Sequence, residues 1–263
     1  MKVGPGGEML DGMCLRSFAM WWVGLGWLGS LAAAEPEVEV AFEAVRIDRT
    51  VAVDGELEAY LAPYRAGVEA FASEVIGYAA EPLSRSRPEC GLSNLVADSL
   101  RAVGAKEFEE EVDLAVTNFG GLRRDLPQGP LTMGLIAELS PFENYLTYLV
   151  VEGEFVMELA RQATRGVALS GISVKLDAEG NVLEARVGGE PVEAGKRYRV
   201  VSIDYLVSTY DSLFREEWIV EKRVSKNLVQ RDAIVLRLSE LNAQGVQIYD
   251  AGAGRVEVVT PKK

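Results

Sequence analysis

The stretch DLAVTNFGGLRRDLPQGPLT, residues 113–132, carries the clearest structural signal in the chain. From 112 to 117, apolar residues alternate with polar or small ones, which predicts a β-strand. The chain then turns through Asn-Phe-Gly-Gly at 118–121 and continues into Arg123. Because binding residues concentrate on loops held by a rigid scaffold, we expect this strand and turn to line a ligand site.

Helices and strands follow this turn without strict alternation. A helical stretch at 131–139 leads to Pro-Phe-Glu-Asn at 141–144, and an apolar run at 145–151 predicts a central strand. The remaining predicted elements are a helix at 154–165, a hairpin at 172–187, a strand at 198–203, a helix at 231–241 and closing strands near 246–249 and 255–259. Hairpins beside helices indicate an α+β fold, with a mixed β-sheet and packed helices in a single domain.

Two helices are expected before the turn. The first begins at Asp54 and ends at Gly77, with Pro63 kinking or restarting it. Its apolar stripe consists of Leu57, Leu61, Tyr64, Val68, Phe71 and Val75. The second runs from Pro88 to Gly104, and its apolar face consists of Leu92, Val96, Leu100 and Val103.

The composition is that of a globular protein with few catalytic options. The chain has 263 residues, of which 48% are hydrophobic and 25% charged. The formal net charge of −13 disfavours nucleic acids and anionic membranes as partners. Because the chain contains no histidine, it cannot by itself form a Ser-His-Asp triad, a Cys-His pair or an imidazole-bound zinc site.

The amino-terminal segment has the pattern of a secretory signal. Residues 17–34 carry no charge, follow Arg16 and end in three alanines. This pattern predicts a signal peptide at 1–34 that is cleaved at its end, with a start at Met1 or Met13, and export to the periplasm or the cell exterior. An uncleaved membrane anchor is the alternative for the same segment.

Cleavage would leave an N-terminal extended lead-in at 35–53 and the domain itself at 54–263. Alternating residues between 38 and 53 suggest extended segments in that lead-in. Cys14 would leave with the signal peptide, so the exported chain would hold the lone thiol of Cys90 and no intrachain disulfide. We expect Cys90 to be buried and inert.

Four features stand out as candidate binding positions, and each has an ordinary structural explanation. They are Arg123 after the polar turn, Phe142 with Asn144, Tyr205 with Asp211, and the pair Arg85 and Arg87. A phenylalanine beside proline is usually core, an arginine pair is usually solvated, and a Gly-Gly turn is usually only a turn. Their order along the chain gives them a joint meaning.

That order resembles the C-terminal, substrate-binding domain of the 5′-nucleotidase family, from about Asp54 to Val259. The matching segments are VIGYAAEPLSRSRPECGLSNLVADSLR (75–101), DLAVTNFGGLRRDLPQGPLT (113–132), ELSPFENYLTYLVVEGEF (138–155) and GKRYRVVSIDYLVSTYD (195–211), followed by RDA and GRVEV near the C-terminus. Because these segments follow one another in the same order over most of the chain, a chance similarity is unexpected.

The resemblance implies a domain that holds the nucleoside part of a nucleotide. Phe142 and Tyr205 would stack on the two faces of the base, a contact worth about 1–3 kcal/mol per base. Asn144 would contact the base edge, and Asp211 would accept hydrogen bonds from the ribose hydroxyls. The residues implied on the sugar and phosphate side are Arg123, Asn118 and Arg87.

Three glycine-containing motifs of the family pattern are altered here. Phe119 replaces the first glycine of the family's Asn-Gly-Gly-Gly turn, and Glu143 replaces the glycine of its Pro-Phe-Gly-Asn motif. The family's Gly-Gly-Asp-Gly loop reads Thr-Tyr-Asp-Ser at 209–212. Since glycine permits close approach to a ligand, we expect these side chains to narrow or reshape the pocket.

The resemblance also implies that catalysis resides elsewhere. In that family a separate N-terminal metallophosphatase domain binds two metal ions through carboxylates and imidazoles and performs the hydrolysis. Without histidine, this chain is expected to have no catalytic residue, no metal site, no cofactor and no hydrolytic activity alone. The expected function is nucleoside or nucleotide binding together with a separate metallophosphatase chain. A stand-alone ligand-binding or protein-interaction module with a degenerate pocket is the alternative.

Overall fold

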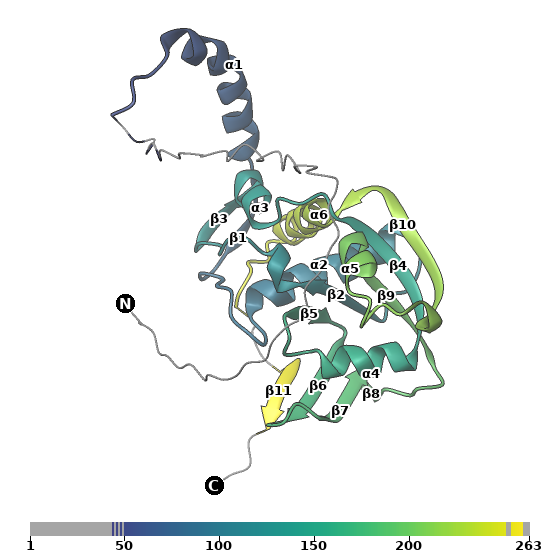
Figure 1. The fold of residues 1–263 in the computed structure, drawn as a ribbon. Coiled ribbons are helices and arrows are strands. Elements are labelled where there is room, and N and C mark those ends of the chain that lie inside the picture. Colours follow the sequence, from purple (N-terminus) through teal and green to yellow (C-terminus); the bar gives the residue numbers. More distant parts are fainter. Residues whose placement is uncertain (1–43, 45, 47, 49, 251–253, 260–263) are drawn as a thin grey trace, which may run out of the picture. The chain divides into compact units, whose positions relative to one another are not determined.

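The computed structural model describes residues 44, 46, 48, 50–250 and 254–259 (Figure 1). From Val53 onward the chain forms one compact unit. The predicted signal peptide lies outside the described residues, as does most of the lead-in. Val51 and Val53 are described, and they are exposed and belong to no strand. No helix in this described part is long and apolar enough to cross a membrane.

A five-stranded mixed sheet forms the centre of the fold. Its strands lie in the order β10 (Ile219–Val229), β4 (Tyr145–Glu152), β9 (Arg197–Ile203), β2 (Leu114–Asn118) and β5 (Val167–Ser170). β2 and β9 run parallel, whereas the other neighbours are antiparallel. All residues of β2 are buried, which requires cover on both faces. The α+β class and the predicted central strands are therefore confirmed, while β5 and β10 were not predicted.

Helix α2 (Gly91–Glu107) packs against β2, β5 and β9, and its predicted apolar face is buried. The helix begins three residues later than predicted because Cys90 caps it. The Cys90 sulfur accepts the N–H of Ser93, and the Ser93 hydroxyl oxygen accepts the N–H of Cys90. Cys90 is buried, as predicted. A Cβ on Gly104 would come within 2.8 Å of a β9 side chain, so this glycine allows the helix to lie close to the sheet.

Smaller elements surround this core (Figure 1). The helices are α3 (Met133–Leu139), α4 (Gly153–Arg161), α5 (Asp204–Thr209) and α6 (Gln230–Ala243), with single turns η1 (Phe119–Gly121) and η2 (Glu216–Trp218). A second sheet has the order β11 (Val256–Val259), β6 (Ile172–Asp177), β7 (Val182–Val187), β8 (Glu190–Pro191). The hairpin predicted at 172–187 is confirmed as β6 and β7. The strand predicted at 246–249 is wrong, because Ile248 forms only a single bridge with Ala79.

Helix α1 (Gly55–Ala72) begins at the predicted cap. The Asp54 side chain accepts the backbone N–H groups of Glu56 and Leu57, which have no partner inside the helix. The helix ends before Gly77, contrary to prediction, because residues 75–79 instead form β1 (Val75–Ala79), which pairs with β3 (Gly129–Thr132).

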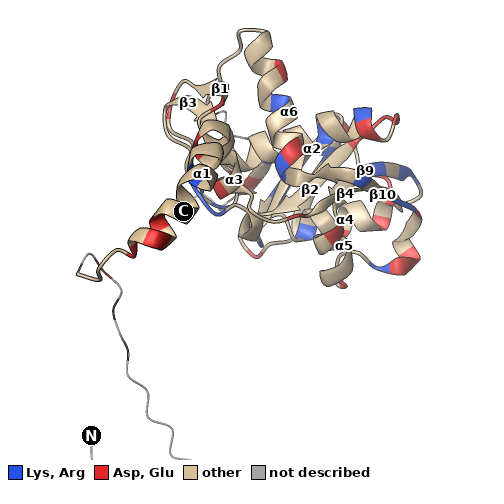
Figure 2. Ribbon diagram, turned by 90° about the horizontal axis from the view of Figure 1, so that it is seen from above, with Lys and Arg blue, Asp and Glu red and all other residues tan. Residues whose placement is uncertain are grey.

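α1 differs from the other long helices in its exposure. No residue of α1 is buried. Pro63 was predicted to kink or restart the helix, and the helix continues through it without a restart. Its C-terminal end meets α3, where the N–H of Met133 donates to the carbonyl of Glu74 over 3.0 Å. Acidic residues recur along this helix (Figure 2). The rest of α1 is therefore held by few contacts within the described residues.

Candidate functional site

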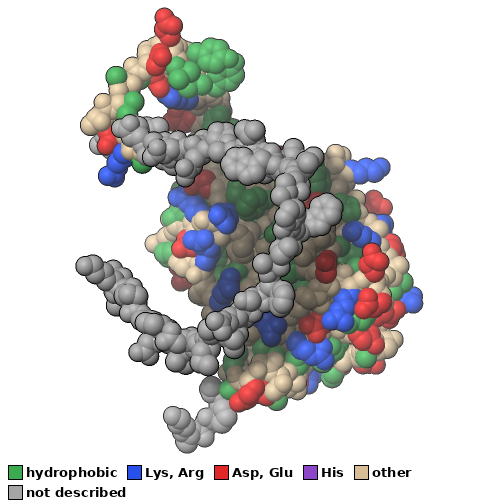
Figure 3. All heavy atoms as spheres, in the orientation of Figure 1, with side chains coloured by type: hydrophobic (Ala, Val, Ile, Leu, Met, Phe, Trp, Pro, Cys, Tyr) green, Lys and Arg blue, Asp and Glu red, His purple; other side chains and the backbone are tan. Residues whose placement is uncertain are grey.

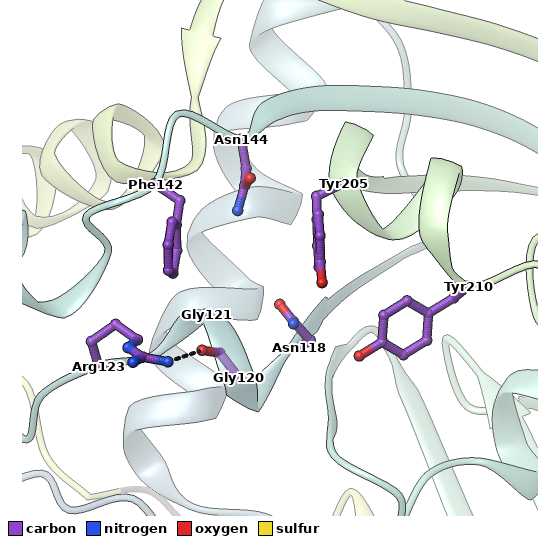
Figure 4. Close-up of a pocket in the computed structure, with 8 residues that line it drawn as sticks. All are labelled: Asn118, Gly120, Gly121, Arg123, Phe142, Asn144, Tyr205 and Tyr210. Carbon is purple, nitrogen blue, oxygen red and sulfur yellow. Dashed lines mark hydrogen bonds between the residues drawn. The ribbon is translucent and has the colours of Figure 1, made fainter. Parts of the chain in front are cut away.

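A cavity of about 330 Å³ opens where the end of β2, the loop before β4 and helix α5 meet. We call it the aromatic cavity. It is lined by Asn118, Gly120, Gly121, Arg123, Phe142, Asn144, Tyr205 and Tyr210 (Figure 4). The structure thus brings together five of the seven predicted site residues, from segments that lie up to 87 positions apart in the sequence.

Two aromatic rings form opposite walls of the aromatic cavity. Phe142 comes from the loop before β4 and Tyr205 from the first turn of α5, and the two rings face each other across the open space (Figure 4). Phe142 is 45% exposed and Tyr205 is 46% exposed. Apolar ring surface left in water is unfavourable. The arrangement therefore favours a flat ligand that covers both rings.

The wall that carries Phe142 is anchored by a buried glutamine. The backbone N–H of Gln230 donates to the carbonyl of Asn144 over 2.8 Å. The Gln230 side chain accepts from the Thr117 hydroxyl at 2.6 Å and donates to the Ser140 hydroxyl at 3.1 Å. Gln230, Thr117 and Ser140 are all fully buried. Such a satisfied buried network fixes β2, the end of α3 and the loop 141–144 relative to one another.

A second anchor connects the two walls. One oxygen of the Asp204 carboxylate accepts the backbone N–H of Tyr145 at 3.0 Å and that of Tyr205 at 2.8 Å. Tyr145 follows directly after the loop 141–144, and Tyr205 is the opposite ring. Asp204 therefore holds the start of α5 against the start of β4, which sets the separation of the two rings.

The floor of the aromatic cavity is the turn predicted from the sequence. Asn118 ends β2 and is 7% exposed, and its side-chain oxygen Oδ1 has no hydrogen-bond partner among the described residues. A Cβ on Gly121 would lie 3.0 Å from this oxygen, so a larger residue there would press on the amide. An unpaired buried acceptor is costly, and a ligand hydroxyl or amino group would satisfy it.

A cationic group lies at the edge of the aromatic cavity. The guanidinium carbon of Arg123 is 5.9 Å from the centroid of the Phe142 ring, which is within cation–π range. One of its terminal nitrogens donates to the carbonyl of Gly120 over 3.4 Å (Figure 4). The Arg123 side chain remains exposed, so it is accessible to an anionic group.

Arg87 lies in a neighbouring pocket. This pocket, which we call the Arg85/Arg87 pocket, has a volume of about 320 Å³ and is lined by Arg85, Ser86, Arg87, Phe119 and Asp125. The Arg87 guanidinium lies 5.7 Å from the centroid of the Phe119 ring. Arg85 is bound to Asp125 at 2.8 Å, so its charge is partly neutralised.

The side chains that replace the expected glycines are distributed differently. Phe119 is buried and lines the Arg85/Arg87 pocket, so it does not fill the aromatic cavity. Glu143 is exposed and is not part of the aromatic cavity lining, whereas Tyr210 forms part of its wall. Asp211 is exposed and does not line the aromatic cavity either, so the structure does not bring it to the other predicted residues.

Two residues that support the site were missed by sequence reasoning, Gln230 and Asp204, whereas the side chain of Tyr210 lies at the cavity as its place in the altered loop predicted. Gln230 binds Thr117, which is 113 positions away, and no local pattern announces such a contact. Asp204 lies beside Tyr205 in a predicted segment, but only the fold shows that it also reaches Tyr145. In the described part of the chain, no group of three His, Cys, Asp or Glu side chains is placed to hold a metal ion.

Comparison with known proteins shows which proteins the chain is similar to. The chain is 33% identical over 126 residues to endonuclease YhcR of Bacillus subtilis, covering 46% of this chain and 10% of that protein. It is 26% identical over 186 residues to cell wall protein Lmo0130 of Listeria monocytogenes, covering 60% of this chain and 24% of that protein. The chain thus spans a quarter or less of the length of these relatives.

The fold matches a solved structure. The 5′-nucleotidase precursor of Thermus thermophilus superposes with a TM-score of 0.64 at 22% identity, over 78% of this chain and 43% of that chain. The family model for the 5′-nucleotidase C-terminal domain matches residues 75–216, which contain every predicted site residue. The chain therefore belongs to the 5′-nucleotidase C-terminal domain family.

Proposed function

We propose that the aromatic cavity binds the nucleoside part of a nucleotide, with the base between Phe142 and Tyr205. The observation that carries this proposal is the pair of half-exposed rings that face each other (Figure 4). A flat base covers both apolar faces at once, and stacking contributes about 1–3 kcal/mol per base. Membership of the 5′-nucleotidase C-terminal domain family supports a nucleotide ligand.

Two amide side chains supply the polar recognition. Asn144 offers both a donor and an acceptor to the edge of the base. Asn118 Oδ1 accepts a hydrogen bond from a ribose hydroxyl. This bond satisfies a buried acceptor that otherwise has no partner, a situation that costs about 1–3 kcal/mol. Asn118 therefore takes the ribose contact that the resemblance implied for Asp211, because Asp211 does not line the aromatic cavity.

The phosphate side of the ligand is cationic. Arg123 lies at the edge of the aromatic cavity. Its guanidinium group can donate two hydrogen bonds to a phosphate that projects out of the cavity. Arg87 lies against the Phe119 ring in the Arg85/Arg87 pocket and does not line the aromatic cavity, so it is suited only to a ligand that extends beyond the nucleoside. The proposal therefore assigns Arg87 a role with nucleotides and none with free nucleosides.

The catalytic step belongs, in this proposal, to a separate metallophosphatase chain that acts with this one. The chain contains no histidine, and its family resemblance is to a substrate-binding domain. We also propose that the chain is exported and that residues 1–34 are cleaved as its signal peptide. The signal pattern supports export, and so does the similarity to a protein described as a cell wall protein.

Thermal unfolding in the presence of adenosine, AMP and ribose 5-phosphate tests the binding proposal. We expect adenosine and AMP to raise the unfolding temperature, because both carry a base that stacks. Ribose 5-phosphate is the matched control without a base and should shift the temperature much less. An equal shift with all three compounds would show that the rings are not the binding determinant.

The catalytic part has a separate test. The chain is mixed with an isolated metallophosphatase domain of a 5′-nucleotidase, and AMP hydrolysis is compared with that of the domain alone. We expect faster hydrolysis in the mixture, with the gain lost in the Phe142→Ala variant. If the mixture is no faster although adenosine binds, the chain is a stand-alone binding module.

A further inference from the structure

The predicted apolar stripe of α1 has no partner within the described residues, apart from its C-terminal end. We call five of its members the α1 seam: Leu57, Leu61, Tyr64, Val68 and Phe71. Leu61 is partly exposed, and the other four are between 53% and 66% exposed. Figure 3 shows hydrophobic side chains gathered on the outer part of this helix. Nothing in the aromatic cavity uses these residues.

The spacing of the α1 seam is that of a coiled coil. Successive members lie four, three, four and three positions apart, which is the alternation of a and d positions in a heptad repeat. Tyr60, which is 65% exposed, widens the α1 seam on one side, and its ring centroid lies 5.6 Å from that of Tyr64. The α1 seam therefore predicts contact with one other helix along its length.

α1 also needs such a contact for its own stability. It contains Pro63 and Gly67 in its interior, which cost about 3 and 1 kcal/mol relative to alanine in an isolated helix. In proteins most of the stability of a helix comes from the packing of its apolar face against another element. Its main contact with the rest of the described chain is at its last turn, where a Cβ on Gly134 would lie 3.0 Å from Ala72.

We propose that α1 pairs in antiparallel orientation with α1 of a second copy of this chain. The charges beside the α1 seam favour this partner. Glu58 and Arg65 flank the seam on the same side and are bound to each other across the exposed surface of one helix. When Leu61 lies opposite Tyr64 of the second copy, Glu58 of each copy faces Arg65 of the other. The seam is thus complementary to itself in apolar content and in charge.

The dimer is expected to be weak. An 18-residue helix is about 27 Å long, and a single pair of such helices buries less than the roughly 800 Å² per partner of a typical stable interface. We therefore expect a dissociation constant in the micromolar range, without any change in the aromatic cavity. This inference goes beyond the proposed ligand-binding function and does not depend on it.

Sedimentation velocity of the full 263-residue chain tests the proposal across micromolar concentrations. We expect a reversible monomer–dimer equilibrium. Val68→Lys places a charge in the α1 seam and should weaken the dimer by about tenfold or more. Ala66→Lys adds the same charge on the opposite face of α1 and should leave the dimer intact. A monomer at all concentrations, or equal dimerisation of both variants, would overturn the proposal.

A charge exchange identifies the occupant as a second copy. Glu58→Arg alone places like charges opposite each other twice and should weaken the dimer by about threefold to tenfold. The double variant Glu58→Arg with Arg65→Glu restores both pairs between copies and should recover the affinity. If the double variant dimerises no better than the single one, the antiparallel pairing is wrong. Unchanged unfolding in dilute solution checks that every variant is folded.

Discussion

The aromatic cavity and α1 both leave aromatic rings in water, but the rings are supported in different ways. Behind Phe142 and Tyr205 lie the buried side chain of Gln230 and the carboxylate of Asp204, which bind four separate segments through hydrogen bonds. Tyr64 has no such support, and α1 contains no buried residue.

This difference indicates what each surface binds. A concave site with fixed walls is pre-organised for a small rigid ligand, since little ordering entropy is lost when that ligand binds. A convex helix with a 3-4 apolar repeat has no walls, and it becomes ordered by packing against a second helix. Exposed aromatic residues alone do not separate these cases, whereas the hydrogen bonds behind them do.

The largest expected effect on stability comes from a substitution that removes the buried hydrogen bonds behind the aromatic cavity. Gln230→Leu leaves the buried hydroxyls of Thr117 and Ser140 without their partner and should lower the free energy of unfolding by about 2–4 kcal/mol. Urea denaturation measures this change. Gln244→Leu, at the exposed C-terminal end of the same helix, is the matched control and should stay within about 0.5 kcal/mol. Equal effects would mean that Gln230 is not an anchor.

Removal of either ring should affect the ligand rather than the fold. Phe142→Ala and Tyr205→Ala should each weaken adenosine binding by about tenfold, because each removes one stacking face. The free energy of unfolding should change by less than about 1 kcal/mol, since both rings are half-exposed. Tyr249→Ala removes an exposed ring outside the aromatic cavity and serves as the control. Binding that survives both substitutions would remove these rings from the site.

Much of the site was predictable from sequence. The strand at 112–117 and its polar turn follow from local alternation and glycine content, and the family resemblance named both Phe142 and Tyr205. Neither source could supply Gln230, whose hydrogen-bond partners come from β2 and from the end of α3. Such pairing depends on how distant segments meet in space, and polar residue type alone carries no information about it.

The fold was less predictable at the edges of the elements. β10 was missed because its charged residues, as in Glu-Lys-Arg at 221–223, interrupt any apolar alternation, yet it pairs with β4 along its length. The first helix was extended to Gly77 because Val75 continues its apolar spacing. Pairing with β3 takes Val75 into β1 instead, which is a tertiary contact that local spacing does not reveal.

The pH dependence of stability should differ between ion pairs in the body of the domain and the ion pair on α1. Burial raises the pKa of the Asp113 carboxyl, but hydrogen bonds from Arg199 on β9 outweigh it, so the pKa lies below its ordinary value. A depressed carboxyl pKa stabilises the fold above the unfolded-state value, and this stability is lost as pH falls below about 4.

Arg199→Met tests this assignment. It should remove about 1 kcal/mol at neutral pH and flatten the loss of unfolding free energy between neutral and acidic pH. Arg65→Met breaks the exposed pair with Glu58 on α1 and should change the profile much less, because solvent screens that pair. Identical pH profiles for the two variants would contradict the distinction between the two regions.

The smallest expected effect lies on α1 itself. Tyr64→Ala in dilute solution should change the free energy of unfolding by less than about 0.5 kcal/mol, because the side chain is 60% exposed and alanine favours the helix. Chemical denaturation at protein concentrations too low for dimerisation measures this change in the free energy of unfolding. A loss of more than about 1 kcal/mol would show that α1 is integrated into the core.

Titration calorimetry of adenosine into the purified chain from Glu35 onward, without added metal, tests the central claim most directly. We expect saturable binding with a dissociation constant below about 1 mM, or about 4 kcal/mol of binding free energy, and at least a fivefold loss of affinity in Phe142→Ala. The absence of saturable binding by adenosine and AMP alike, in a chain that unfolds cooperatively, would contradict the assignment of the aromatic cavity as a nucleoside site.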